Sequence, residues 1–152
     1  MKKILICGIL CLSQGLVADE VLTASERVVA LTLLGEARGE GRIGMYAVAC
    51  VIQKRALQRN LTHRSVCLES NQFGIWNGRD GIKRESQLWY LWDSKLSGYA
   101  RELSRKVSRE KLNQRVTGGA DHFCTLESNP DWIKGKTPVK VIGKHKFFKL
   151  EL

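Results

Sequence analysis

The sequence lacks the short motifs that usually hold a catalytic metal. It has only three histidines, and neither they nor the five cysteines form a His-x-x-x-His, His-Glu-x-x-His or Cys-x-x-Cys pattern. A zinc enzyme needs two or three such ligands converging on one point, usually with a carboxylate. A site would have to be built from His63, His122, His145 and Cys124. We interpret His122 and His145 as polar cleft or surface residues, and we expect no metal and no other cofactor.

Nucleic-acid recognition motifs, internal repeats, low-complexity tracts and linkers are also missing. The formal charge of +10 and the pI near 9.6 predict an anionic partner. Charge alone admits nucleic acid, a membrane surface or a bacterial wall polymer. The missing motifs argue against nucleic acid. The length of 152 residues allows one domain with its own core, and we expect a monomer.

Residues 1–18 have the layout of a secretory signal peptide. Lys2 and Lys3 precede an apolar run over residues 4–12, and Ala18 stands before Asp19. The run is too short to span a bilayer stably. An uncleaved anchor or a buried first helix is the alternative. We expect residues 19–152 to be secreted to the periplasm or cell wall, with no stable membrane span after cleavage.

The stretch from residue 23 to residue 55 predicts two helices that meet at a glycine-rich corner. Thr23 and Glu26 have the form of a capping box, which places the start of the first helix there. The second helix, over residues 43–57, is apolar on nearly every side and should be central and buried. Glycines at the corner are typical of backbone that turns or approaches another group closely.

Glu36, Arg38 and Glu40 stand at this corner. A carboxyl held against the apolar surface of a buried helix loses solvation, which raises its pKa and keeps it protonated closer to neutral pH. Such a group can donate a proton to a leaving oxygen. The alternative interpretation is an ordinary helix C-cap with charged residues in solvent.

Later segments predict the rest of an α+β fold. Residues 86–114 carry the longest helical pattern, broken near residues 97–98. After Gly118 and Gly119, short extended pieces at residues 120–125, 139–142 and 146–150 predict a small antiparallel sheet. We therefore expect one mainly helical domain with a small C-terminal antiparallel sheet.

The cysteines allow one disulfide at most once residues 1–18 are removed. Cys50, Cys67 and Cys124 would then remain, in an oxidising compartment. Cys50 lies in the buried helix and reads as a core residue. Cys67 with Cys124 is the better pair, and three free thiols are the alternative.

Residues 35–40 (Gly-Glu-Ala-Arg-Gly-Glu) and the run at residues 44–55 resemble the core motif of the SleB-type cell-wall hydrolases. Further matching pieces follow in the same order, at residues 66–68, 72–76, 118–123, 132 and 141–148. The resemblance covers almost all of residues 19–152 and implies a lysozyme-like catalytic domain. Two departures are Lys54, where the family usually has Asn, and Gly74, where it often has Ser or Thr.

The resemblance implies that Glu36 is the catalytic acid and that the substrate is peptidoglycan. Related lytic transglycosylases use one glutamate as acid and base, and the substrate's own C6 hydroxyl replaces water to give a 1,6-anhydromuramyl end. We expect Glu40 to orient Arg38 at the corner. The other predicted substrate contacts are Gln72, Trp76, His122 and Trp132.

Three alternatives stay open. A muramidase would need a second carboxylate, for which Asp80 and Asp121 are candidates. An N-acetylmuramoyl-L-alanine amidase would act on the stem peptide of the same wall. A noncatalytic basic wall-binding module would use the same charge and aromatic residues, but it would not require Glu36 in an apolar corner.

Overall fold

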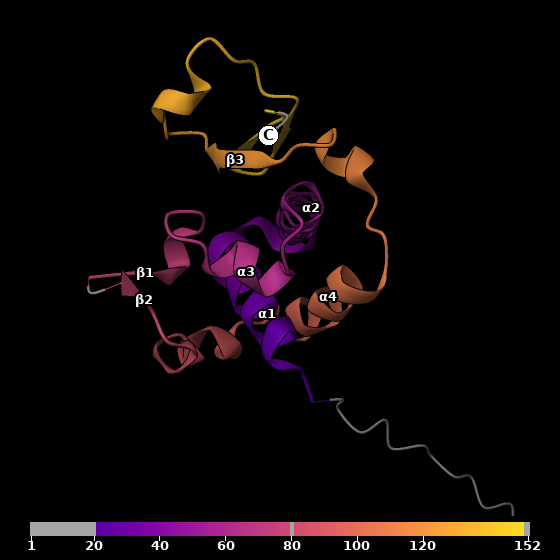
Figure 1. The fold of residues 1–152 in the computed structure, drawn as a ribbon, viewed down its shortest axis with the longest axis vertical. Helices are drawn as coiled ribbons and strands as arrows, with labels where there is room; N and C mark the ends of the chain where they lie inside the picture. Colours follow the sequence, from indigo (N-terminus) through magenta and orange to yellow (C-terminus); the bar gives the residue numbers. More distant parts are fainter. Residues whose placement is uncertain (1–20, 80, 151–152) are drawn as a thin grey trace, which may run out of the picture.

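The computed structural model describes residues 21–79 and 81–150, which form a helical body with a small sheet on one side (Figure 1). The predicted signal peptide lies outside the described residues. The body contains the helices α1 (Ala24–Ala37), α2 (Gly41–Arg59), α3 (His63–Leu68) and α4 (Ser97–Arg109). None of the helices in the described ranges has the length and apolarity that crossing a bilayer requires.

Helix α1 begins at the capping box that the sequence predicts. The Thr23 Oγ1 accepts the Glu26 N–H at 3.2 Å, and the Glu26 Oε2 accepts the Thr23 N–H at 2.9 Å. Both otherwise unpaired donors at the helix start are thereby satisfied. The helix then buries most of its length, from Val28 to Leu34, and ends at Ala37 where the glycine-rich corner begins.

Helix α2 lies between the rest of the helical body and the sheet, which explains why it is apolar all round (Figure 1). Val48 and Ile52 pack into the cluster formed with α1, whereas Ala47 and Val51 pack against Phe147 of the sheet. The prediction of a central buried helix is confirmed. The corner before it is a single 3₁₀ turn, η1 (Arg38–Glu40), and α2 begins at Gly41 with a φ of 67° that favours glycine.

The predicted helix over residues 86–114 is wrong in its first part. Residues 85–93 form two 3₁₀ turns, η3 (Glu85–Gln87) and η4 (Trp89–Asp93), before α4 starts at Ser97. Leu88 and Leu91 are the buried residues of this segment. Their spacing of three fits a 3₁₀ turn as well as an α-helix, so the apolar pattern does not distinguish the two.

The C-terminal strands form the predicted antiparallel sheet. The order is β3 (His122–Thr125), β5 (His145–Phe148) and β4 (Lys140–Ile142), with β5 in the centre. Thr125 and Ile142 both stand opposite His145 in the register. A separate two-stranded hairpin, β1 (Asn77–Gly78) and β2 (Gly81–Ile82), follows the turn η2 (Gly74–Trp76). The remaining 3₁₀ turns are η5 (Gln114–Thr117) and η6 (Asp131–Ile133).

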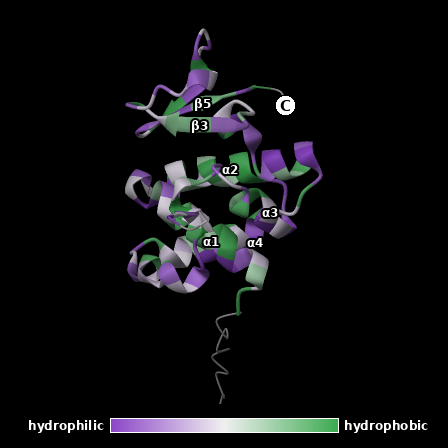
Figure 2. Cartoon of the chain, turned by 60° about the vertical axis from the view of Figure 1, so that its left-hand side comes forward, coloured by the Kyte–Doolittle hydropathy of each residue, from purple (hydrophilic) through white to green (hydrophobic). Residues whose placement is uncertain are grey.

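Apolar residues concentrate in α1, α2 and the central strand, and polar residues cover the loops (Figure 2). The main cluster joins α1 and α2 to residues of α3, α4 and the loop at Phe73 and Trp76. Phe123 contacts this cluster and also the smaller one beneath the sheet. The expected α+β architecture is confirmed, and its two parts meet along α2.

Candidate active site

Glu36 lies in the last turn of α1 and is half-buried. Its Oε1 accepts the Ile75 N–H at 3.0 Å. Burial raises the pKa of the Glu36 carboxyl, against smaller opposing effects of the Ile75 N–H, the Arg55 guanidinium and the Gly74 N–H. The C-terminal end of a helix also carries partial negative charge, which disfavours a carboxylate there. The site therefore favours the protonated form that a general acid needs.

The loop that supplies the Ile75 N–H presses directly on α1 at Gly35. A Cβ at Gly35 would overlap the Ile75 side chain, so glycine at this position lets Ile75 pack this close to α1. On the neighbouring residue, a Cβ at Gly74 would lie 3.9 Å from the Glu36 Oε1. A serine or threonine at that position would bring a hydroxyl to the carboxyl, and this chain has none there.

A groove with a volume of about 630 Å³ opens beside Glu36. One wall is the corner between α1 and α2, and the other is formed by the loop after β3 and the turn before β5. The side chains that line it are those of Glu36, Arg38 and Glu40 on the first wall and Thr125, Leu126, Glu127, Lys144 and His145 on the second.

Glu40 joins the two walls of the groove. Its Oε2 accepts the Lys144 N–H at 2.7 Å, across 104 positions of the chain. Gly143 has a φ of 56°, and a Cβ there would overlap the Glu40 carboxylate. Arg38 instead donates from Nη1 to the Leu34 carbonyl at 3.3 Å. Glu40 thus fixes the turn before β5, and the predicted role of orienting Arg38 is not what the structure shows.

Arg55 and Asp121 connect α2 to the sheet behind Glu36. The Arg55 Nε donates to the Asp121 carbonyl at 2.6 Å, and its guanidinium lies 5.4 Å from the centre of the Phe73 ring. Burial lowers the pKa of Arg55 to about 10, so it stays charged at neutral pH. Its charge therefore acts on Glu36 and partly offsets the effect of burial on that carboxyl.

The profile of the Cell Wall Hydrolase family matches residues 39–148, which is well over half of the chain. This chain belongs to the Cell Wall Hydrolase family. The resemblance of the sequence motifs is thereby confirmed. The matched range begins just after Glu36 and includes Glu40, Arg55, Asp121 and His145.

Two solved structures are similar to this cell wall hydrolase. The catalytic domain of the germination-specific lytic transglycosylase SleB from Bacillus anthracis is 24% identical over 88% of this chain and 100% of that chain, with a TM-score of 0.63. The catalytic domain of SleB from Bacillus cereus is 23% identical over 86% of this chain and 94% of that chain, with a TM-score of 0.56. At these identities the comparison establishes the fold. A comparison with curated protein sequences gives no significant match.

The substrate contacts predicted from sequence do not all gather in the groove of the hydrolase. Glu36, Arg38 and Glu40 line it, but the other four lie outside its lining. His122 and Trp132 form a pair on the sheet with ring centres 5.4 Å apart, and the His122 Nδ1 bonds to Asp121 at 2.9 Å. Gln72 is half-buried in the turn before Phe73.

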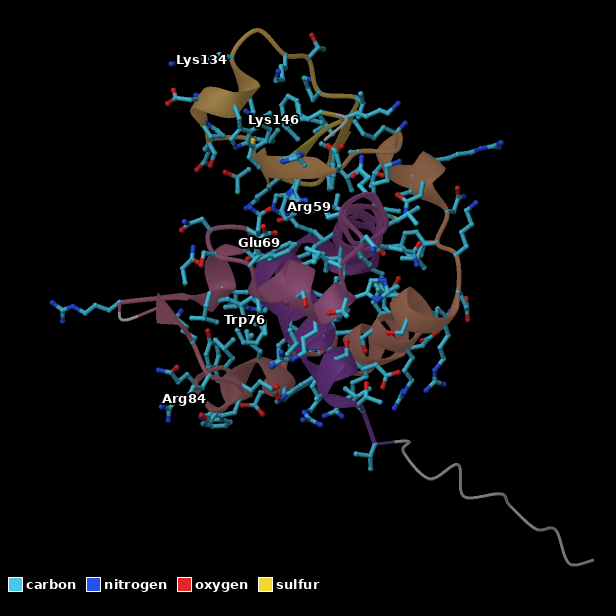
Figure 3. The ribbon with its side chains drawn as sticks, in the orientation of Figure 1. Arg59, Glu69, Trp76, Arg84, Lys134 and Lys146 are labelled. Carbon is cyan, nitrogen blue, oxygen red and sulfur yellow. The ribbon has the colours of Figure 1, made fainter. Side chains whose placement is uncertain are left out.

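Trp76 is a core residue rather than an open stacking surface. Its side chain is 1% exposed, and its Nε1 donates to the Thr32 Oγ1 of α1 at 2.8 Å. Figure 3 labels Trp76 within the helical body. The polar edge of the ring is satisfied inside the protein. Trp76 therefore supports the loop that carries Ile75, and we do not keep it as a substrate contact.

Asp121 is not free to act as the second carboxylate of a muramidase. Its side chain is fully buried, and the Leu150 N–H and the Gln58 Nε2 donate to it at 2.9 and 3.2 Å. Burial alone would raise the pKa of Asp121, but the bonds from His122, Leu150 and Gln58 outweigh it and lower the pKa to about 2. Asp80, the other candidate, lies outside the described residues.

The sequence patterns do not identify Ile75 or Arg55 as contributors to the site, and they place His145 only as a polar cleft or surface residue. Ile75 acts through its backbone N–H, which no side-chain pattern shows. Arg55 could have been noticed as a cation one helical turn after the apolar residues Val51 and Ile52, because a buried cation needs partners. The expectation of a cleft or surface position for His145 does not fix its place, because its place in the groove depends on the pairing of β5 with β3.

The predicted disulfide between Cys67 and Cys124 is absent. Cys50, Cys67 and Cys124 are all free thiols. Cys67 is fully buried on α3 near Thr32 and Arg55, whereas Cys124 lies on β3 near the Ser128 carbonyl. Burial raises the pKa of the Cys67 thiol to about 12, so it has no tendency to ionise. Cys50 is buried in α2, as predicted.

A larger hollow of about 860 Å³ lies between α2 and the end of α4 and shares no residue with the Glu36 groove. It contains no carboxyl in an environment like that of Glu36: Glu110, its one acidic residue, is exposed. Within residues 21–79 and 81–150, no three His, Cys, Asp or Glu side chains come together in a way that could hold a metal ion. The candidate chemistry therefore centres on Glu36.

Proposed function

We propose that this cell wall hydrolase cleaves the glycan strand of peptidoglycan by a lytic transglycosylase reaction, with Glu36 as both acid and base. The observation that carries the proposal is the Glu36 carboxyl, half-buried, with a raised pKa and facing an open groove. Family membership supports a wall substrate. The similar structure from Bacillus anthracis carries the description lytic transglycosylase, which agrees with this choice.

In this reaction the Glu36 carboxylic acid protonates the glycosidic oxygen as the bond from that oxygen to C1 breaks. An oxocarbenium-like centre develops at C1, and Glu36 is left as a carboxylate. The carboxylate then takes the proton of the C6 hydroxyl of the same muramic acid, whose oxygen forms the new bond to C1. The products are a 1,6-anhydromuramyl end and a free hydroxyl on the leaving sugar, and Glu36 is protonated again.

The fixed partners of Glu36 suit both halves of this cycle. Burial and the end of α1 favour the acid before cleavage. The Ile75 N–H at 3.0 Å and the charge of Arg55 then limit the cost of the carboxylate that forms. These groups do not need to move when Glu36 passes between its protonated and its ionised form.

A muramidase reaction is the second candidate, because Glu127 offers another carboxylate in the groove. Glu127 follows β3, is exposed, and belongs to the wall opposite Glu36. A carboxylate there could activate water, which would replace the C6 hydroxyl as the attacking group. Water attack leaves a reducing sugar end, so the products separate the two reactions.

We further propose that the protein is secreted and acts as a monomer. The signal-peptide layout of residues 1–18 and a wall substrate support export. The net charge of +10 supports adsorption to an anionic wall. The same positive charge opposes the association of two copies.

The test is mass spectrometry of the fragments that the purified protein releases from isolated peptidoglycan, alongside Glu36→Gln. We expect anhydromuramyl ends from the native protein and a loss of about 10²- to 10⁴-fold in rate for the variant, the usual contribution of a general acid. Glu102→Gln is the control, because Glu102 is exposed on α4, pairs with Lys106 and lies outside the lining of the Glu36 groove. It should leave the rate unchanged.

Other outcomes would redirect the proposal. Reducing ends that disappear in Glu127→Gln would establish the muramidase. Free stem peptides, or undiminished activity of Glu36→Gln, would overturn the role of Glu36 and favour an amidase. Binding to the wall without any product would favour a noncatalytic wall-binding module.

A further inference from the structure

His145 is a buried side chain in the groove, and its Nδ1 has no partner within residues 21–79 and 81–150. The residue is 5% exposed, and its Nδ1 makes no hydrogen bond to any described residue. Phe123 packs edge-on against the ring, with ring centres 5.1 Å apart, and Phe147 lies 6.3 Å away. A buried polar atom without a partner costs free energy, and native structures rarely keep one without a reason. Apolar packing alone would be better served by a ring without nitrogen.

His122 shows how this protein satisfies a histidine that has a structural role. It lies on the adjacent strand β3 and is half-buried. Its Nδ1 is bonded to the Asp121 carboxylate at 2.9 Å. His145 has no such anchor, although both residues belong to the same small sheet. None of the described residues supplies this partner, so a ligand in the groove is the candidate for it.

The position of His145 in the groove is fixed by its backbone. Glu40 holds the preceding residue, Lys144, through the 2.7 Å bond to its N–H. Thr125, the partner of His145 in the strand register, also lines the groove. The backbone is therefore set on both sides, while the ring is held by packing only. A ligand in the groove would not have to replace any hydrogen bond of Nδ1 to a described residue.

Neutral imidazole suits a sugar ligand. Burial lowers the pKa of His145, and the charge of Glu40 opposes this only partly, so the ring is neutral at neutral pH. A neutral ring has one nitrogen that donates and one that accepts. Sugar hydroxyls and acetamido groups can pair with either. An aromatic neighbour such as Phe123 adds an apolar surface beside the polar contact.

We propose that His145 is a substrate-binding residue, whose ring nitrogen forms a hydrogen bond with a hydroxyl or acetamido group of the sugar that lies beside Glu36. The proposal rests on the proposed function for the nature of the ligand. It assigns His145 a part in holding the glycan strand and no part in proton transfer. The bond completes the hydrogen bonding of the ring only when the groove is filled.

The test measures binding and stability in the same variants. Binding of a soluble peptidoglycan fragment, two disaccharide units with their stem peptides, is measured by calorimetry in the Glu36→Gln background. His145→Phe keeps a ring but removes both nitrogens, and His145→Asn keeps a polar atom near the position of Nδ1. We expect His145→Phe to weaken binding about 10-fold, the value of one hydrogen bond, and His145→Asn to recover part of it.

Thermal unfolding separates a binding role from a structural one. If His145 serves the ligand, His145→Phe leaves the melting temperature unchanged or raises it, because an unpaired buried nitrogen is removed. His63→Phe is the control: His63 is half-buried on α3, outside the Glu36 groove, and its change should not affect binding. In the active protein, His145→Phe should raise KM and change kcat little.

Two results would overturn the inference. Unchanged affinity in His145→Phe would do so, and so would a lower melting temperature together with no recovery in His145→Asn. Failure of the proposed function looks different, because Glu36→Gln would then keep its cleavage activity. An inactive Glu36→Gln with normal fragment binding in the His145→Phe background would remove only the role of His145.

Discussion

Glu36 in the helical body and Asp121 at the start of the sheet are both withdrawn from water, yet their pKa values move in opposite directions. Burial raises the pKa of Glu36, and the opposing effects of the Ile75 N–H at 3.0 Å, the Arg55 guanidinium and the Gly74 N–H do not reverse this. Burial acts on Asp121 in the same sense, but bonds from His122, Leu150 and Gln58 lower its pKa to about 2. The hydrogen-bond donors around each carboxyl decide whether its pKa rises or falls on burial.

The two carboxyls also differ in what they suit: Asp121 suits stabilisation of the fold, and Glu36 suits proton transfer in the groove. Asp121 is fully buried and holds the C-terminal end of the chain through the Leu150 N–H. Glu36 is only half-buried and opens on the groove. A carboxylate fixed by several donors is ionised at neutral pH and has no proton to donate, and a carboxyl with few donors adds little to stability. Asp121 is a carboxylate of the first kind, and Glu36 is a carboxyl of the second.

Asp121→Asn should produce the largest change in stability. The amide lacks the negative charge that three donors share, and hydrogen bonds to a charged group contribute about 1.5–3 kcal/mol. We expect the free energy of unfolding, measured by urea titration with circular dichroism, to fall by about 3 kcal/mol. Asp131→Asn serves as the control, because Asp131 is 92% exposed in its pair with Lys134. A loss no greater than that of the control would mean that the charge of Asp121 does not stabilise the fold.

Gly74→Ser should make Glu36 more like Asp121. The new Cβ would lie 3.9 Å from the Glu36 Oε1, so the serine hydroxyl can donate to the carboxylate and lower its pKa. Because the acid must be protonated, activity falls as pH rises through the pKa of Glu36. The descending limb of the pH profile of kcat/KM should therefore move to lower pH, with a several-fold loss at neutral pH. A limb that stays in place would show that Glu36 does not set it.

Gln58→Met should have the smallest effect, because it removes one of the donors to Asp121. The Gln58 Nε2 lies 3.2 Å from the Asp121 Oδ2. The loss at neutral pH should be about 1 kcal/mol in the free energy of unfolding. Unfolding followed by fluorescence at a series of pH values measures this loss of unfolding free energy.

The direction of the pH effect follows from the lowered pKa of Asp121. The folded state binds the proton less tightly than the unfolded state, so this stabilisation is complete above the ordinary value of 3.8 and is lost as pH falls toward about 2. In Gln58→Met the pKa of Asp121 is closer to 3.8, and less stability remains to be lost over that range. An acid transition steeper than that of the native protein would contradict the shared role of the donors.

The sequence predicts the parts of the fold that depend on local patterns. The capping box at Thr23 and the apolar helix α2 are local signals, and both are present. The 3₁₀ turns at residues 85–93 were mistaken for helix, because buried residues three apart fit both. The sheet was predicted from its turns, but the central place of β5 follows from pairing between distant strands, which no local pattern shows.

The site was predictable only where its residues lie together in one short motif. Glu36, Arg38 and Glu40 lie within one short motif and line the same groove. Trp76 was proposed as a sugar contact because it is aromatic and near a turn, and its bond to Thr32 could not be inferred from spacing. The second wall comes from the sheet, and its residues meet Glu36 through tertiary packing alone.

The 2.7 Å bond between Glu40 and the Lys144 N–H has a consequence for the order of events during biosynthesis. The residues of the first wall, 36–40, are made well before those of the second wall, 125–145. Closing so long a segment is costly in entropy until the contacts between the walls form. A nascent chain therefore carries its acid before it has a place to bind glycan, and cutting ability arrives only once the second wall has been made and has folded.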